Sequence, residues 1–157
     1  MRQNIRLPHD AMWLLQRLRG AGYSAYVVGG CVRDSLLGRQ PGDWDICTSA
    51  RPEQMRSLFQ DQQLILTGEK HGTVGVVLHG KPYEITTYRL DGTYQDHRHP
   101  DQVQFVQDLA ADLARRDFTI NAMAYAPGEG IIDLHGGCSD LEAGIVRCVG
   151  DPEARFA

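Results

Sequence analysis

Two aspartates, Asp43 and Asp45, flank Trp44 in a run that is predicted to form a short strand over 43–47. Side chains at positions i and i+2 of a strand share one face, so both carboxylates should point the same way and Trp44 the opposite way. Mg²⁺ prefers carboxylate oxygens and shares its coordination sphere with substrate phosphates. A lone pair of this kind is more often a solvated loop. Here a glycine turn and a short helix precede the pair, and the pair starts an apolar strand, which together favour a metal site.

That glycine turn, Gly29-Gly30, lies between a β-rich run over 24–28 and a predicted helix over 31–37. A strand, a glycine turn and a helix N-terminus together direct free backbone N–H groups at one point, where an anion can bind. Arg33 lies about one turn into the helix and could add a bidentate contact to phosphate. The spacing is not GxGxxG, so a dinucleotide-binding fold has little support. A plain turn beside a surface arginine is an equally good interpretation of these residues alone.

Two further groups of polar residues could join the same site. Glu84 lies in a predicted strand over 82–88 and is a candidate third acidic ligand, because a half-buried carboxylate needs a partner. A solvated glutamate fits its spacing nearly as well. Asp117 and Asn121 are four residues apart in a predicted helix and would share a face, where an acid and an amide can hold ribose hydroxyls.

Arg116 precedes this pair and could contact a phosphate or a base. Taken without context, the group is better explained as a helix N-cap at Asp117 beside exposed basic residues. The remaining elements are expected to alternate between helix and strand. Helices are expected over 10–19, 52–59 and 108–124; strands over 73–79 and 82–88, joined by a turn at Gly80-Lys81; a polar loop over 91–102; and strands over 131–134 and 145–149 around Gly136-Gly137.

The composition is that of one globular domain: 157 residues, 42% hydrophobic and 23% charged. The sequence has no apolar run long enough for a membrane span and no charged-then-apolar leader, so we expect no membrane partner. Its four cysteines form no CxxC pair, and reduced thiols in the cytoplasm are the simplest expectation. The net charge of −4 argues against a wide grip on a nucleic acid backbone.

Taken together, these segments resemble the N-terminal catalytic head domain of bacterial class II tRNA nucleotidyltransferases, the CCA-adding enzymes, within the tRNA nucleotidyltransferase/poly(A) polymerase family. The similarity runs in order through nearly the whole chain. It is carried by YVVGGCVRDSLLG (26–38), GDWDICTSA (42–50), KHGTVGVV (70–77), YEITTYR (83–89), DGTYQDHRHP (91–100), RRDFTINAMAY (115–125) and DLHGGCSDLEAGIVRCVGDPEARF (133–156).

The resemblance implies roles for these residues. Asp43 and Asp45 would hold the catalytic Mg²⁺, and Glu84 falls on a third acidic position. The residues implied in nucleotide binding are Gly29, Gly30, Arg33, Arg116, Asp117 and Asn121. The implied reaction is two-metal phosphoryl transfer, in which C and A from CTP and ATP are added to the tRNA 3′ end in tRNA maturation and repair.

The resemblance also implies a fold. We expect an α+β, polymerase beta-like nucleotidyltransferase head, with a mixed β-sheet and helices packed on one side. Residues 1–150 would form this head and residues 151–157 the start of a helical neck. An EDxxR-type segment that reads the base, and the neck, body and tail that hold tRNA, do not occur in the sequence. We therefore expect this chain to bind Mg²⁺ and NTP weakly and to select bases poorly.

Three other functions remain open at this point. A poly(A) polymerase of the same family tends to carry a basic stretch after the paired aspartates, which residues 60–72 lack. An A-adding specialist is harder to separate, whereas the loop over 91–100 argues against an enzyme that adds C alone. A nucleotide-binding module without catalysis is disfavoured by the intact acidic residues. The sequence does not define an oligomeric state.

Overall fold

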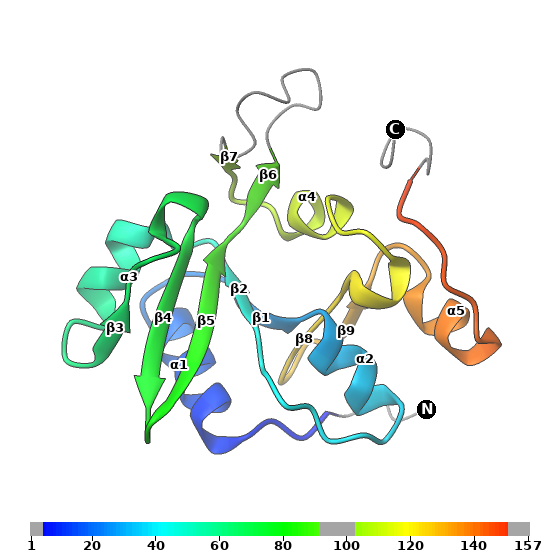
Figure 1. The fold of residues 1–157 in the computed structure, drawn as a ribbon, viewed down its shortest axis with the longest axis horizontal. Coiled ribbons are helices and arrows are strands. Elements are labelled where there is room, and N and C mark those ends of the chain that lie inside the picture. Colours follow the sequence, from blue (N-terminus) through cyan, green and yellow to red (C-terminus); the bar gives the residue numbers. More distant parts are fainter. Residues whose placement is uncertain (1–4, 92–102, 151–157) are drawn as a thin grey trace.

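A seven-stranded mixed sheet lies at the centre of the computed structural model, which describes residues 5–91 and 103–150 (Figure 1). The strand order is β3-β4-β5-β2-β1-β8-β9; β2 and β5 are parallel, and the other neighbours are antiparallel. The strands are β1 (Ala25–Val28), β2 (Ile46–Thr48), β3 (Gln63–Ile65), β4 (Thr73–Leu78), β5 (Lys81–Thr87), β8 (Met123–Ala126) and β9 (Gly130–Asp133). A separate two-stranded ribbon consists of β6 (Arg89–Asp91) and β7 (Val103–Phe105).

Five α-helices and two 3₁₀ helices surround these strands in the described part of the chain. They are α1 (His9–Gly20), α2 (Gly30–Leu36), α3 (Pro52–Leu58), α4 (Leu109–Ala114) and α5 (Gly137–Ala143), with η1 (Glu69–His71) and η2 (Thr119–Asn121). None of the helices in the described ranges is long and apolar enough to cross a membrane.

The sheet buries apolar side chains on both of its faces. Val27 of β1 belongs to a large core that also contains Leu14 of α1 and Met55 of α3. The next residue along the strand, Val28, belongs to a small core with Leu113 of α4. Because neighbouring side chains of a strand point to opposite faces, α1 and α3 cover one face and α4 covers part of the other.

The predicted fold class is confirmed, with one detail corrected. We expected helices on one side of the sheet, and α1, α2 and α3 do pack together against the large core. The exception is α4, which lies on the opposite face. All four residues of β1 are buried, so the second face also needs an apolar cover, and α4 provides part of it.

The helix expected over 108–124 is wrong in its second half. It ends at Ala114, and the chain then passes through η2 and enters strand β8. That strand pairs with both β1 and β9, and all its residues are buried. The hydrogen bonds and burial gained in the sheet outweigh the local preference of this segment for a helix.

Two other local expectations also differ from the structure. The segment over 145–149 makes one isolated β-bridge and no strand, while the glycine pair that was read as a turn leads into α5. The hairpin turn between β4 and β5 consists of His79 and Gly80, because Leu78 pairs with Lys81. Both turn residues have positive φ, 51° and 76°, as a type I′ turn requires.

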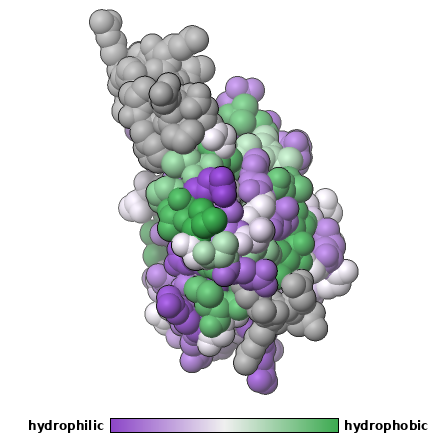
Figure 2. Space-filling view, turned by 90° about the vertical axis from the view of Figure 1, so that its right-hand side faces the viewer, coloured by the Kyte–Doolittle hydropathy of each residue, from purple (hydrophilic) through white to green (hydrophobic). Residues whose placement is uncertain are grey.

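The side of the molecule that carries α5 has a mixed surface. Exposed large hydrophobic residues flank this helix in the sequence: Leu134, Ile145 and Val146. Figure 2 shows this side, where hydrophobic and hydrophilic residues are interspersed. The segment 151–157, expected to begin a neck, and residues 92–102 of the predicted loop lie outside the described residues.

Candidate active site

The predicted acidic residues lie where strand β2 begins beside the middle of its parallel neighbour, β5. Strand β2 starts at Ile46, so Asp43 and Asp45 lie just before it rather than within it. Ile46 is in register with Ile85 of β5, and this places Asp45 and Glu84 side by side, each one residue before the paired position. Both aspartates and Glu84 are exposed.

The orientation expected for this segment is confirmed at Trp44. Its side chain is buried in the large core, on the face covered by α1 and α3, while Asp43 and Asp45 are exposed. Tyr83 and Ile85 also belong to the large core, so Glu84 between them points to the opposite face. The acidic residues therefore lie on the face that carries α4.

The neighbouring carboxylates are close enough to affect the protonation of Asp45. Asp45 is exposed, yet the surrounding protein removes enough water to raise the pKa of its carboxyl group. The negative charges of Glu84 and Asp43 raise this pKa further, whereas the positive charge of Arg116 lowers it. The site thus places concentrated negative charge opposite an arginine.

A pocket of about 400 Å³ lies between these acidic and basic groups. All the predicted nucleotide-binding residues except Arg33 line it. The lining consists of Gly29, Gly30, Asp45, Arg115, Arg116, Asp117 and Asn121. Residues that are separated by more than 80 positions in the sequence therefore line one polar pocket.

The glycine turn lets the chain pass close to the arginine wall. Gly29 has φ 86°, a conformation that other residues adopt with strain. Its N–H donates to the carbonyl oxygen of Met123 at 3.1 Å, which fixes the turn to strand β8. A Cβ atom at Gly29 would lie 3.6 Å from Nη1 of Arg116 and would narrow the pocket.

Arg33 does not line the pocket itself but contacts a residue that does. Its Nη1 donates to Oδ1 of Asn121 at 2.7 Å, and its Nε donates to Oδ1 of Asp34 at 3.1 Å. Arg33 thereby orients the amide of Asn121, which lines the pocket, and the contact with phosphate suggested by the sequence stays a prediction.

Asp117 and Asn121 meet for a reason other than the predicted one. They do not share a face of a helix, because α4 has ended and Asn121 is the last residue of η2. The carboxylate of Asp117 accepts from the backbone N–H of Phe118 at 2.7 Å. A bend in the chain, rather than helical periodicity, brings both side chains to the pocket.

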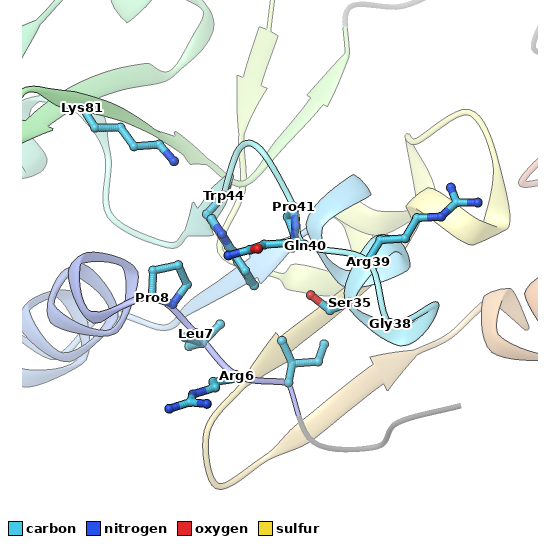
Figure 3. A pocket seen from close by; sticks show the side chains of 11 residues that line it. Arg6, Leu7, Pro8, Ser35, Gly38, Arg39, Gln40, Pro41, Trp44 and Lys81 are labelled. Atoms are coloured by element: carbon cyan, nitrogen blue, oxygen red, sulfur yellow. The ribbon is translucent and has the colours of Figure 1, made fainter.

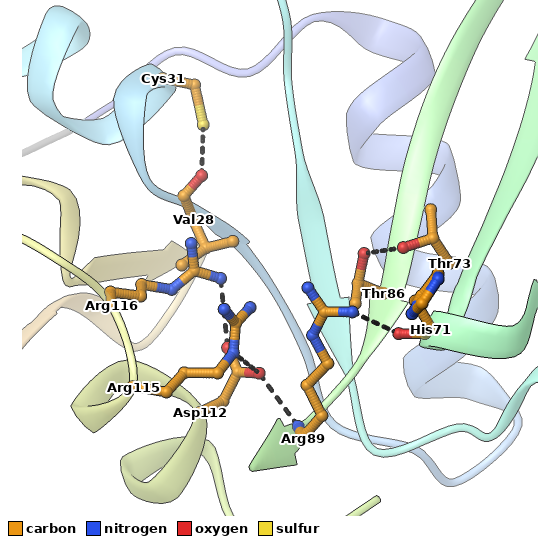
Figure 4. A network of polar contacts seen from close by, with 9 residues as sticks. All are labelled: Val28, Cys31, His71, Thr73, Thr86, Arg89, Asp112, Arg115 and Arg116. Atoms are coloured by element: carbon orange, nitrogen blue, oxygen red, sulfur yellow. Dashed lines mark hydrogen bonds and ion pairs between the residues drawn. The ribbon is translucent and has the colours of Figure 1, made fainter. Parts of the chain in front are cut away.

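Two residues of this region were missed from the sequence. Arg115 lines the pocket beside Arg116, and both donate to the buried carboxylate of Asp112 (Figure 4). The signal was present in the spacing, since Asp112 lies three and four residues before the two arginines and would share a helical face with them. The Nε atom of Arg116 is buried and has no hydrogen-bond partner among the described residues.

The acidic residues fit Mg²⁺ held jointly with a substrate. Within residues 5–91 and 103–150, no three His, Cys, Asp or Glu side chains lie close enough together to hold a metal ion by themselves. Mg²⁺, however, is usually bound through one or two carboxylates, with phosphate oxygens and water completing its octahedron. The negative charges of Glu84 and Asp43 both act on Asp45, and a cation such as Mg²⁺ would balance them.

A larger pocket, of about 660 Å³, lies on the other side of Trp44. It contains none of the predicted site residues. Figure 3 shows Trp44 among its lining residues, with Lys81 and Arg39 on different sides of it. Since Asp45 lines the smaller pocket and Trp44 the larger one, the segment 43–45 separates the two.

A mixed sheet with paired acidic residues at the start of a strand, facing a glycine turn and arginines, defines the nucleotidyltransferase class. The chain belongs to the poly(A) polymerase head domain family, whose model matches residues 25–147. It is 52% identical over 146 residues to the CCA-adding enzyme of Ligilactobacillus salivarius, which covers 93% of this chain and 36% of the relative.

Solved structures give the same result. The chain is similar to the Bacillus stearothermophilus CCA-adding enzyme in complex with CTP, with a TM-score of 0.83 and 48% identity over 94% of this chain and 34% of that one. It is also similar to the Thermotoga maritima CCA-adding enzyme complexed with tRNA_CCA, with a TM-score of 0.71 and 29% identity over 92% and 34% of the two chains. The predicted resemblance to CCA-adding enzymes is confirmed, and the chain spans about a third of the length of these relatives.

Proposed function

We propose that this chain is the catalytic head of a CCA-adding tRNA nucleotidyltransferase, which transfers nucleotides from CTP and ATP to the tRNA 3′ end with Mg²⁺. The observation that carries the proposal is the pocket in which Asp45 faces Arg115 and Arg116. A triphosphate bound to Mg²⁺ has the complementary pattern, because its metal needs carboxylates and its phosphate oxygens need cations.

In this proposal, different residues of the site bind the metal and the triphosphate. Asp43 and Asp45, with Glu84 beside them, would hold Mg²⁺, which when bound neutralises charge on the phosphates and activates the attacking hydroxyl. The guanidinium groups of Arg115 and Arg116 bind the triphosphate oxygens. Positioning and charge neutralisation are sufficient for phosphoryl transfer, so the pocket needs no covalent nucleophile.

The sugar and the backbone have their own contacts in this proposal. Asp117 and Asn121 lie where a carboxylate and an amide can hold ribose hydroxyls, and Arg33 keeps the amide of Asn121 oriented. Gly29 and Gly30 let the nucleotide approach the backbone closely. The choice of CTP and tRNA as ligands is supported by the two relatives whose structures contain them.

We propose that the reaction takes place in the cytoplasm. Four free thiols fit this reducing environment: Cys31, Cys47, Cys138 and Cys148. The two most deeply buried of them, Cys31 and Cys47, have their pKa raised by burial and stay protonated at neutral pH.

A single-turnover assay tests the proposal. The chain, in excess over tRNA, is incubated with Mg²⁺ and radiolabelled CTP or ATP, using tRNAs that lack CCA, CA or A. The expected result is slow incorporation of C and A, with poor selection between them, that disappears in Asp43→Ala and in chelator. A chain that labels none of these tRNAs contradicts the proposal.

The same assay separates the alternative functions. A poly(A) polymerase adds long runs of A to RNAs unrelated to tRNA, and an A-adding specialist labels only tRNA that already ends in CC. A nucleotide-binding module without catalysis binds CTP and labels nothing. Each of these outcomes rules out the CCA-adding function for this chain.

A further inference from the structure

Asp112 is a fully buried carboxylate of α4 beneath the arginine wall of the pocket. Its Oδ1 accepts from Nε of Arg115 at 3.3 Å and from the backbone N–H of Arg89 at 3.1 Å. Its Oδ2 accepts from Nη2 of Arg116 at 3.1 Å. Figure 4 shows the two guanidinium groups converging on this side chain, with Arg89 reaching it from the β6 side.

This arrangement fixes the two arginines before any ligand arrives. A buried carboxylate is stable only when it is paired and hydrogen-bonded, so Asp112 holds both guanidinium groups strongly. The side chains of Arg115 and Arg116 are only 17% and 19% exposed, which is low for arginines that line an open pocket. Because each uses part of its planar group on Asp112, the remaining N–H groups are directed elsewhere.

The remaining N–H groups of Arg116 point away from Asp112, toward the glycine turn that lines the pocket. Its Nη2 is held by Asp112, and its Nη1 approaches the turn at Gly29, 3.6 Å from the position of a Cβ there. Its positive charge also reaches Asp45, whose pKa it lowers. The guanidinium therefore lies between the buried carboxylate of Asp112 and the turn at Gly29, and its charge acts on Asp45.

The third partner connects the pocket to the β6–β7 ribbon. The residue whose N–H donates to Asp112, Arg89, begins strand β6, and its own side chain donates to the carbonyl oxygen of His71 at 2.5 Å. Val106, which follows β7, donates from its backbone to Tyr88 at 2.9 Å. Asp112 thus holds the base of the ribbon and the arginine pair in one network.

We propose that Asp112 is a positioning residue for the nucleotide. It presets the guanidinium of Arg116, and with it that of Arg115, in the orientation that receives the triphosphate, and it anchors this pair to the start of β6. Asp112 itself makes no contact with the nucleotide. The identity of the ligand rests on the function proposed above, whereas the orientation of Arg116 does not.

A double-mutant cycle with CTP and Mg²⁺ tests the ligand part of this proposal on the chain as it is. Asp112→Asn keeps the shape of the side chain and removes its charge, and we expect the Kd for CTP to rise about tenfold. Arg116→Ala should have a similar or larger effect. In the Arg116→Ala background, Asp112→Asn should change the Kd by less than about twofold, because the group through which it acts is gone. Equal effects in both backgrounds overturn the proposal.

The Arg116 Nε–H signal in an NMR spectrum tests the orientation without nucleotide. We expect it to be sharp in the wild type and shifted and broadened in Asp112→Asn. Asp140→Asn is the matched control, since Asp140 is also a buried carboxylate with an arginine partner, Arg147, and that arginine does not line the pocket. It should leave the Arg116 signal unchanged. An unchanged signal in Asp112→Asn overturns the proposal.

This pair of measurements separates the two claims. A wild type that binds no CTP contradicts the proposed function, and the NMR result still decides the role of Asp112. If Asp112→Asn does not fold, Arg116→Lys replaces it: lysine keeps the charge, but one ammonium cannot bridge Asp112 and the pocket as a planar guanidinium does. Wild-type affinity for CTP in Arg116→Lys would then contradict the proposal.

Discussion

The two faces of the sheet serve different purposes. The face under α1 and α3 is closed by a continuous apolar core that includes Leu14, Leu18 and Phe59. The face under α4 has a smaller core, and charged residues surround it, among them the buried Asp112 and the acidic cluster at Asp45. From this difference we infer that the first face carries most of the stability, while the second holds charge in positions that favour binding over stability.

The strongest way to test this division is to remove an acidic residue from the second face. Asp43→Ala should lower nucleotide incorporation about a thousandfold or more, because the variant loses a proposed ligand of the catalytic Mg²⁺. Because Asp43 is exposed, the melting temperature of the variant should stay close to that of the wild type. Single-turnover incorporation and thermal unfolding measure the two effects. Normal incorporation by this variant would exclude Asp43 from the site.

A second substitution tests the other face of the sheet by removing a large buried side chain from it. Leu14 is fully buried in the large core, so Leu14→Ala should lower the free energy of unfolding by about 3 kcal/mol. The folded fraction should bind CTP as the wild type does, because this face does not contribute to the pocket. Urea denaturation and CTP titration test this. A tenfold weaker affinity at full folding would show that the two faces are not independent.

The glycine turn joins the two faces, so a substitution there should affect both properties. Gly29→Ala forces a Cβ into a backbone with φ 86° and should cost about 1–3 kcal/mol of stability. The added methyl also approaches Arg116 and should weaken CTP binding. Gly38→Ala is the matched control, since Gly38 also has positive φ but its Cβ would meet nothing within 4 Å. That variant should lose stability and keep its CTP affinity.

The smallest expected effect concerns the charge on Asp45. Its pKa is raised above the ordinary value of 3.8. In the pH window between that ordinary value and the raised pKa, the folded protein therefore binds more protons than the unfolded chain. Stability therefore falls across that window and then stays constant. Asp45→Asn removes this loss, so without Mg²⁺ it should be more stable than the wild type at about pH 7 and equal to it at about pH 3. Urea denaturation at both pH values tests the sign.

Much of this site could be predicted from the sequence, because its first half is local. A strand, a glycine pair and a helix follow one another over 24–37, and the acidic pair comes a few residues later. The alternation of Asp43, Trp44 and Asp45 was enough to assign their faces. The ordered set of motifs then indicated the family, which the match over residues 25–147 confirmed.

The second half of the site depends on contacts that the sequence does not display. The path from Arg115 to Asn121 was read as a helix, and the pairing of β8 with β1 decided otherwise. The proximity of Asp45 and Glu84 depends on the parallel register of β2 and β5. Burial of Asp112 depends on how α4 packs against the sheet. In each case, the decisive interaction joins segments that are distant in the chain.

The most direct measurement is a titration of the chain with CTP and Mg²⁺, followed by NMR signals of backbone and side-chain N–H groups. Signals of Gly29, Gly30 and the side chain of Arg116 should shift together and saturate at one Kd. Those of α1 should stay in place. Shifts that centre instead on the larger pocket, at the Trp44 indole and Arg39, would contradict the assignment of the nucleotide site.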